Sequence, residues 1–108
     1  MKNLNIAGVA DDIRSTVSAR PELIKQIGIF GSLARGDHGS NSDIDLLVEY
    51  NAAPSFDMES FTDYCEMCGQ IRERLSGTYS REVDIVHIES WAPDEFLMQA
   101  IGGEVVWL

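Results

Sequence analysis

The sequence predicts an α+β domain in which helices pack on one face of a small mixed β-sheet. Three observations predict this class: short apolar runs typical of strands, longer segments with apolar residues at helical spacing, and an irregular order of the two. The 108 residues favour a single domain spanning residues 1–108. Apolar residues make up 44% and charged residues 24%, which is ordinary for a globular protein and excludes disordered and fibrous classes.

The first half of the chain predicts one helix followed by two strands. Apolar residues recur every three or four positions over 4–20, which indicates a helix. An apolar run predicts a strand within 23–30. Ser32 is then expected to cap a short helical turn that Gly36 ends. A second strand is expected over 43–50.

The second half predicts a long helix, a third strand, a last helix and a closing strand. Helical spacing of apolar residues covers 57–75, and the Ser-Gly-Thr stretch at 76–78 is expected to end that helix. The third strand is expected over 82–88. A further helix should begin at 90–93, and a short strand at 104–108 is expected at a sheet edge.

The charge of the chain restricts its partners. Eighteen acidic and eight basic residues give a net charge of −10. Such a surface repels polyanions, which excludes general binding to nucleic acids and anionic membranes. The charge is compatible with binding of divalent cations or of a basic partner, although a solvated acidic surface that aids solubility accounts for most of it.

The cellular location expected for the chain follows from two features of its sequence. No apolar run reaches the roughly 18 residues that span a bilayer, and the first residues lack the features of a signal peptide. A cytoplasmic protein is therefore expected.

Cys65 and Cys68 have no second pair of metal ligands, so they are expected to be reduced helix residues one turn apart rather than a redox pair or half of a zinc site.

Two acids interrupt the predicted second strand. Side chains at Asp43 and Asp45 share one face of a strand, with backbones roughly 7 Å apart. Carboxylates placed in this way could bind one Mg²⁺ ion, which prefers hard oxygen ligands. The alternative is that both acids lie on the solvent-facing side of an edge strand.

A Gly-Ser turn precedes these acids by a fixed distance. Glycine at position 31 lets a ligand approach the backbone, Ser32 can donate to a phosphate oxygen, and Arg35 adds a positive charge one turn later. The turn therefore predicts a phosphate site beside the acids. By itself the dipeptide is common, and a plain tight turn is the alternative.

A third acid lies within the apolar core of the predicted third strand. If that strand lies beside the Asp43–Asp45 strand, Asp84 completes a group of three carboxylates, which could hold two metal ions about 4 Å apart. Asp84 could then also take a proton from an attacking hydroxyl. The alternative is an acid at a strand end in water. His87 is expected on the opposite face of this strand, and His38 in the loop is expected to be solvated.

The stretch FGSLARGDHGSNSDIDLLVEY, together with the later VDIV, resembles the polymerase-β-like nucleotidyltransferases, and more narrowly the minimal nucleotidyltransferases. The narrower group comprises MNT-domain, MntA-like antitoxins that act on HEPN-domain toxins. The resemblance covers nearly the whole chain and rests on three separated motifs in the same order and spacing. It implies the polymerase-β-like fold, ATP as the substrate, Mg²⁺ as the cofactor and transfer of AMP to a tyrosine of the toxin.

The resemblance also implies roles for individual residues. Asp43, Asp45 and Asp84 would be the catalytic and metal-binding residues. The nucleotide-binding residues would be Gly31, Ser32, Arg35 and Ser42. Arg35 could instead lie at a surface or partner contact, and Ser42 is interpreted as a local hydrogen-bonding residue.

Three functions therefore follow from the sequence. The first is an Mg²⁺-dependent protein adenylyltransferase that acts as an antitoxin in a hetero-oligomer with its toxin. The second is a non-catalytic antitoxin that neutralises the toxin by binding alone, for which the acidic charge is suited. The third is a small-molecule nucleotidyltransferase completed by another chain, since no residues remain here for an acceptor domain.

Overall fold

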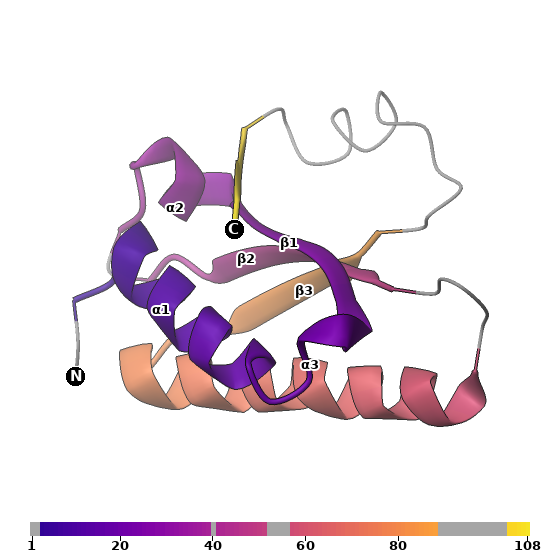
Figure 1. Ribbon diagram of the computed structural model, residues 1–108. Coiled ribbons are helices and arrows are strands. Elements are labelled where there is room, and N and C mark those ends of the chain that lie inside the picture. The colour runs from indigo at the N-terminus through magenta and orange to yellow at the C-terminus, as the bar shows by residue number, and fades with distance from the viewer. Residues whose placement is uncertain (1–2, 40, 52–56, 89–103) are drawn as a thin grey trace.

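Four strands form one mixed sheet in the computed structural model, which describes residues 3–39, 41–51, 57–88 and 104–108 (Figure 1). The strands are β1 (Ile24–Phe30), β2 (Ile44–Tyr50), β3 (Val83–His87) and β4 (Val105–Trp107). Their order across the described sheet is β3-β2-β1-β4. Strand β1 runs antiparallel to β2 and β4, whereas β2 and β3 are parallel. The predicted mixed sheet with a short closing strand is confirmed.

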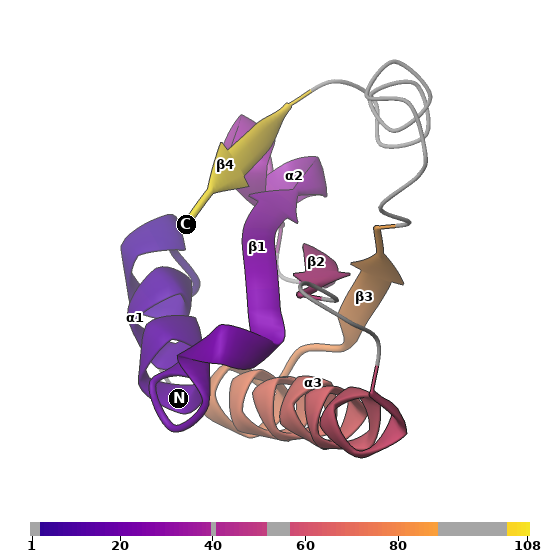
Figure 2. The ribbon, with the colours of Figure 1, turned by 45° about the vertical axis from the view of Figure 1, so that its right-hand side comes forward.

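The two long helices cover the same face of this sheet. Helices α1 (Ile6–Val17) and α3 (Met58–Tyr79) lie together on one side of it (Figure 1, Figure 2). The short helix α2 (Gly31–Arg35) follows β1, and a 3₁₀ turn (Pro21–Leu23) precedes β1. The predicted packing of helices on one face is confirmed. None of the helices in the described ranges has the length and apolar character needed to cross a membrane.

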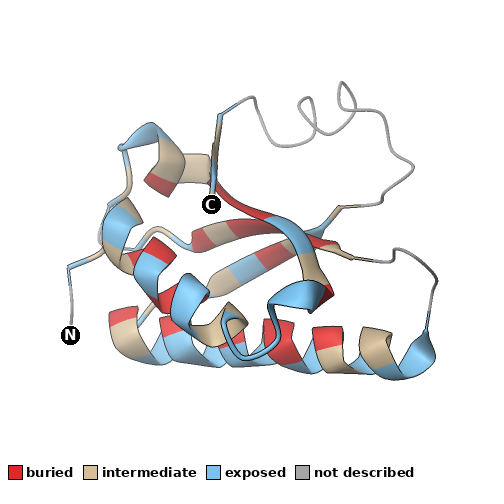
Figure 3. Ribbon diagram, viewed as in Figure 1, coloured by how far each residue is buried: buried red, intermediate tan, exposed pale blue. Residues whose placement is uncertain are grey.

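The hydrophobic core lies between the sheet and these helices (Figure 3). Strand β2 contributes Ile44, Leu46 and Val48 to it, and all three side chains are fully buried. Because side chains alternate along a strand, Asp45 and Leu47 point to the opposite face of the sheet. The chemistry predicted for the acids therefore belongs to the face that α1 and α3 leave uncovered.

Helix α3 extends beyond its predicted end, so the stop expected at 76–78 was wrong. The last turn reaches Tyr79, whose side chain is buried and donates a hydrogen bond of 3.0 Å to Asp12 in α1. Ser80 then ends the helix in the left-handed conformation, with φ of 54°. This tertiary hydrogen bond and the burial of Tyr79 outweigh the low helix propensity of Gly77.

The other helix ends differ from prediction by a few residues. Helix α1 begins later than expected because Asn5 caps it, accepting a hydrogen bond of 2.8 Å from the Gly8 amide. The predicted cap at Ser32 was wrong, since Phe30 holds the capping position of α2 and makes no side-chain cap. Gly36 ends α2 in the left-handed conformation, as predicted. The helix predicted from 90–93 lies outside the described residues.

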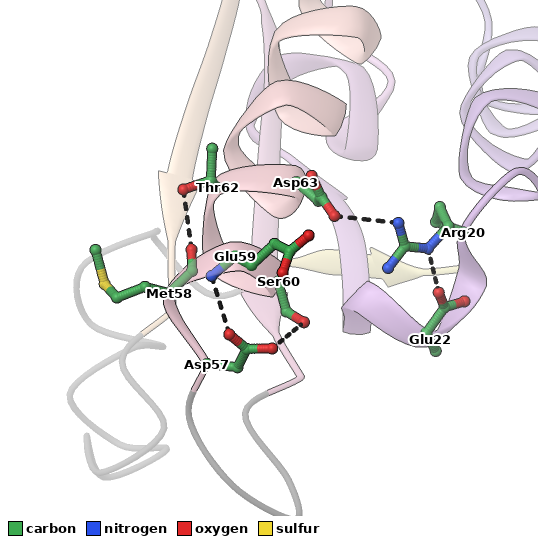
Figure 4. A network of polar contacts seen from close by, with 8 residues as sticks. All are labelled: Arg20, Glu22, Asp57, Met58, Glu59, Ser60, Thr62 and Asp63. Carbon is green, nitrogen blue, oxygen red and sulfur yellow. Dashed lines mark hydrogen bonds and ion pairs between the residues drawn. The ribbon is translucent and has the colours of Figure 1, made fainter.

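Polar contacts fix the start of α3 and the turn before β1 (Figure 4). The Asp57 carboxylate caps α3, accepting hydrogen bonds of 3.0 Å from the Glu59 amide and 3.2 Å from the Ser60 hydroxyl. The Arg20 guanidinium pairs with both Glu22 and Asp63. These contacts tie the connection between α1 and β1 to α3, although exposed ion pairs of this kind contribute only about 0–1 kcal/mol each.

Candidate functional site

The parallel pairing of β2 with β3 brings two of the three predicted acids side by side. Asp45 and Asp84 are direct partners in the register of these strands, so their side chains share one face. Asp43 lies immediately before β2, two residues from Asp45. Asp43 and Asp84 are exposed, and Asp45 is half-buried. The expectation that the third strand lies next to the Asp43–Asp45 strand is confirmed.

The surroundings of Asp45 raise its pKa. Burial raises the pKa of Asp45, and the negative charges of Asp84 and Asp43 raise it further. The positive charge of Arg35 acts in the opposite direction and lowers that pKa. Asp84, Asp43 and Arg35 therefore all lie within electrostatic reach of Asp45.

The glycine of the predicted phosphate turn lies directly against Asp45. Gly31 has φ of +73°, a conformation that residues with a side chain rarely adopt. A Cβ atom added there would lie 3.1 Å from Asp45 Cγ and would overlap Asp45 Oδ2. Both the backbone conformation and the close approach require glycine, so the turn and the acid are parts of one site.

Of the other predicted nucleotide-binding residues, two lie on α2 and one lies in the loop before β2. Ser32 is half-buried in α2, one residue after Gly31. Arg35 ends α2, and its Nε donates to Asp37 Oδ2 at 3.3 Å. Ser42 makes the local hydrogen bond expected of it: its Oγ accepts from the Gly39 amide at 2.7 Å.

The donor set can be compared with the needs of Mg²⁺. Carboxylate oxygens are the ligands that this ion prefers, and a cation would offset the burial and the repulsion that together raise the pKa of Asp45. Among the described residues, however, no three His, Cys, Asp or Glu side chains stand in position to hold an ion together. The donor chemistry fits Mg²⁺, and the magnesium site stays a prediction.

Histidines and cysteines lie apart from the acids. His87 points to the helix face, where its Nδ1 lies 2.7 Å from the Tyr64 hydroxyl, which confirms the predicted orientation. His38 is half-buried with Nε2 3.2 Å from the Leu4 carbonyl, so the solvated position expected for it was wrong. Both cysteines are free on α3, as expected; Cys65 is exposed and Cys68 is buried.

One residue near the site was missed by the sequence reasoning. Arg81 lies just before β3, and its Nη1 donates hydrogen bonds of 2.8 Å to the carbonyls of Gly39 and Ser42. It therefore holds the loop that leads to Asp43. No spacing rule indicates a contact between segments about forty residues apart; the only available signal was a basic residue beside the strand that carries Asp84.

The raised pKa of Asp45 predicts that the acid site destabilises the protein. A raised pKa means that the folded protein disfavours the ionised carboxylate. Protonated Asp45 therefore contributes stability at acid pH, and this contribution is lost as pH rises through the pKa that Asp45 has in the folded protein. We expect Asp45→Asn to raise the free energy of unfolding by about 0.5–1 kcal/mol at neutral pH without divalent cations. Denaturant unfolding at neutral pH and near pH 4 measures this gain, which should shrink at the acid end. Asp11→Asn, at an exposed acid of α1, is the control; an Asp45 variant no more stable than this control would contradict the prediction.

The fold and the arrangement of acids define a class of protein. A mixed sheet that carries paired acids behind a Gly-Ser turn is characteristic of nucleotidyltransferases, and the profile of the "Polymerase beta, Nucleotidyltransferase" family matches residues 11–107. The chain belongs to this family.

Archaeal proteins with the name protein adenylyltransferase are similar to it. One from Methanocaldococcus jannaschii, provisionally given that name, is 35% identical over 63 residues, which cover 58% of this chain and 56% of the relative. The protein adenylyltransferase MntA of Thermococcus cleftensis is 44% identical over 32 residues, covering 30% of this chain and 32% of that protein. The chain thus spans little more than half the length of the first relative.

Solved toxin–antitoxin structures share the fold. A toxin–antitoxin structure with AMP-PNP has a TM-score of 0.57 at 22% identity, covering 90% of this chain and 69% of the other. A structure of a mutant of the MntA-HpeT toxin–antitoxin pair has a TM-score of 0.58 at 22% identity, covering 98% of this chain and 72% of the other. At this identity the likeness concerns the fold.

Proposed function

We propose that this protein transfers AMP from ATP to a hydroxyl group of a partner toxin and thereby acts as its antitoxin. The observation that carries the proposal is the direct pairing of Asp45 with Asp84 on the sheet face where Gly31 approaches Asp45. Nucleotidyl transfer needs carboxylates and a phosphate-binding turn at one point. The names of the archaeal relatives support the reaction class.

The three acids would hold Mg²⁺ once their side chains turn toward one ion, since no three acidic side chains among the described residues are grouped around one point. Asp45 and Asp84 come from adjacent strands, and Asp43 comes from the loop before β2. When bound, Mg²⁺ ions neutralise charge on the triphosphate and stabilise the oxygens that attack and leave. The raised pKa of Asp45 supports this role, because burial and the negative charges of Asp84 and Asp43 disfavour its ionised form, and a bound cation would offset that cost.

The triphosphate would lie against the start of α2. Gly31 has no side chain, so its backbone lies directly against the Asp45 carboxylate and would also let the phosphates approach closely. The Ser32 hydroxyl would donate to a phosphate oxygen, and Arg35 would place a positive charge at the end of the same short helix. Ser42 would support the site through the turn that it forms with Gly39. The AMP-PNP present in the similar toxin–antitoxin structure supports ATP as the donor.

The reaction forms one bond and breaks one bond at the α-phosphorus. The acceptor oxygen attacks that phosphorus, the bond from the α-phosphorus to the oxygen that bridges the α- and β-phosphates breaks, and pyrophosphate leaves with that oxygen. Asp84 lies on the outer strand of the described sheet and is exposed, so an incoming hydroxyl can reach it. We assign Asp84 to take the proton of that hydroxyl as the oxygen–phosphorus bond forms.

The acceptor is expected to come from another protein. Two of the three tyrosines of this chain, Tyr64 and Tyr79, are buried and hydrogen-bonded, and Tyr50 packs its ring against Phe61. We propose a tyrosine of a HEPN-domain toxin as the acceptor. The toxin–antitoxin assemblies among the similar structures support a toxin as the partner.

The test is AMP transfer in a purified system. The protein, its partner toxin, Mg²⁺ and ATP labelled at the α-phosphate are incubated, and the toxin is analysed by mass spectrometry for the mass of an AMP group on tyrosine. The Asp43→Asn, Asp45→Asn double variant should lose at least about a thousandfold in transfer rate. A folded wild-type protein that binds the toxin and adds no AMP would exclude the enzyme.

Neutralisation by binding alone is the second candidate, favoured by the net charge of −10. An RNA-binding toxin presents basic surface that an acidic domain would recognise. The same double variant separates the two functions. If it still suppresses toxicity without AMP transfer, binding is sufficient; if it loses both, the chemistry is required.

A further inference from the structure

Arg81 connects the two segments that carry the acids. It lies three residues before Asp84, and its side chain reaches the loop before β2. One nitrogen, Nη1, donates to the Gly39 carbonyl and to the Ser42 carbonyl, each at 2.8 Å. Among the described residues Arg81 forms no ion pair with a carboxylate, so its hydrogen bonds go to the backbone of this loop.

The contact with Ser42 bears directly on Asp43. The Ser42 carbonyl and the Asp43 amide belong to one peptide plane. A donor that holds this carbonyl in place therefore also fixes the orientation of the Asp43 amide and of the main chain that follows it. On the other side of Asp43, the Ile44 amide donates to the Glu82 carbonyl at 2.9 Å. Asp43 itself is exposed and precedes the strand, so the backbone bonds on its two sides determine its position.

Both of these bonds come from the same segment, because Arg81 and Glu82 adjoin one another just before β3. Two successive residues thus hold the main chain on either side of Asp43, while the strand that they begin carries Asp84. The geometry points to Arg81 as a positioning residue that sets Asp43 relative to Asp84 for cation binding. This inference rests on the proposed function and adds to it a residue that the acid motifs do not contain.

Arg81 and Arg35 are expected to act on the site in different ways. Arg35 acts on Asp45 through its charge, whereas Arg81 is not among the charges that shift the pKa of Asp45. The effect of removing Arg81 should therefore appear in the geometry of the Asp43 loop. A substitution that keeps a nitrogen donor at this position should preserve the geometry of the loop, because both hydrogen bonds come from one nitrogen.

The experiment compares Arg81→Met, Arg81→Lys and Arg72→Met, the last of which removes a positive charge from an exposed position of α3. Hydrogen exchange of backbone amides is measured first. The Ser42 amide donates to the Gly39 carbonyl at 3.3 Å, and Arg81 donates to the same carbonyl. In Arg81→Met the Ser42 amide should exchange about tenfold faster or more, while core amides of α1 and α3 keep their protection. Arg81→Lys should restore most of the protection, and Arg72→Met should match the wild type.

Cation binding and transfer are then measured. The affinity for Mn²⁺ alone, followed by electron paramagnetic resonance, should fall about tenfold in Arg81→Met. The rate of AMP transfer should fall by a similar factor, with a higher Mg²⁺ requirement and little change in KM for ATP. Arg81→Lys should recover both quantities.

The outcomes separate this inference from the proposed function. If Arg81→Met leaves the Ser42 exchange rate or the Mn²⁺ affinity unchanged, Arg81 does not position Asp43. If the wild type transfers no AMP, the proposed function fails, while exchange and Mn²⁺ binding still decide the role of Arg81.

Discussion

Replacing Gly31 with alanine is expected to lower the rate of AMP transfer about a hundredfold or more. The added Cβ would lie 3.1 Å from Asp45 Cγ and would overlap Asp45 Oδ2, so the carboxylate must move. A displacement of about 1 Å at a reacting group costs about a hundredfold in rate.

Gly36→Ala is the matched control for this prediction. Gly36 also has positive φ, at 81°, but a Cβ added there would meet no atom within 4 Å. Each alanine should lower the free energy of unfolding by about 1–2 kcal/mol, because both adopt the left-handed conformation. Only Gly31→Ala should lose activity. Steady-state transfer rates and denaturant unfolding of both variants test this, and equal activity in the two variants would contradict the assigned site.

The acids of the site could be predicted because strand periodicity is local. Asp43 and Asp45 lie two residues apart beside Ile44 and Leu46, and alternation alone requires the acids and the core residues to face opposite sides. The partner strand of Asp84 could not be derived in this way. Strand order is a long-range property, and only the register of β2 with β3 places Asp84 beside Asp45.

Two of the features that were not predicted depend on contacts between distant segments. The end of α3 is set by Tyr79, which meets Asp12 of α1, 67 positions earlier. Arg81 contacts the carbonyls of Ser42 and Gly39, which lie 39 and 42 positions earlier in the chain. Local propensity at Gly77 indicated a helix end, but propensity is a weak term beside burial and a tertiary hydrogen bond.

The Asp12 contact also determines how the two long helices are held together. Asp12 is 6% exposed and lies in α1. It accepts hydrogen bonds of 3.0 Å from the Tyr79 hydroxyl and 3.2 Å from Arg74 Nη2, both from α3. Burial and the hydrogen bond to Asp12 raise the pKa of Tyr79 to about 12, so the phenol stays a donor throughout the neutral range.

We expect Asp12→Ala to lower the free energy of unfolding by about 2–3 kcal/mol, because it leaves the buried Tyr79 hydroxyl without its acceptor and removes a charged hydrogen bond. This is a large part of the roughly 5–15 kcal/mol of a typical domain and should lower Tm by about 10 °C. Asp11→Ala, at a neighbouring acid whose side chain is 81% exposed, should change stability by less than about 0.5 kcal/mol.

A double-mutant cycle identifies the source of this loss. Tyr79→Phe removes the donor, so adding Asp12→Ala to it should cost about 1 kcal/mol less than Asp12→Ala alone. Thermal and denaturant unfolding of the single and double variants give the coupling energy. If the two effects simply add, the hydrogen bond does not hold α1 to α3, and the end of α3 at Tyr79 must be stabilised by burial of the ring alone.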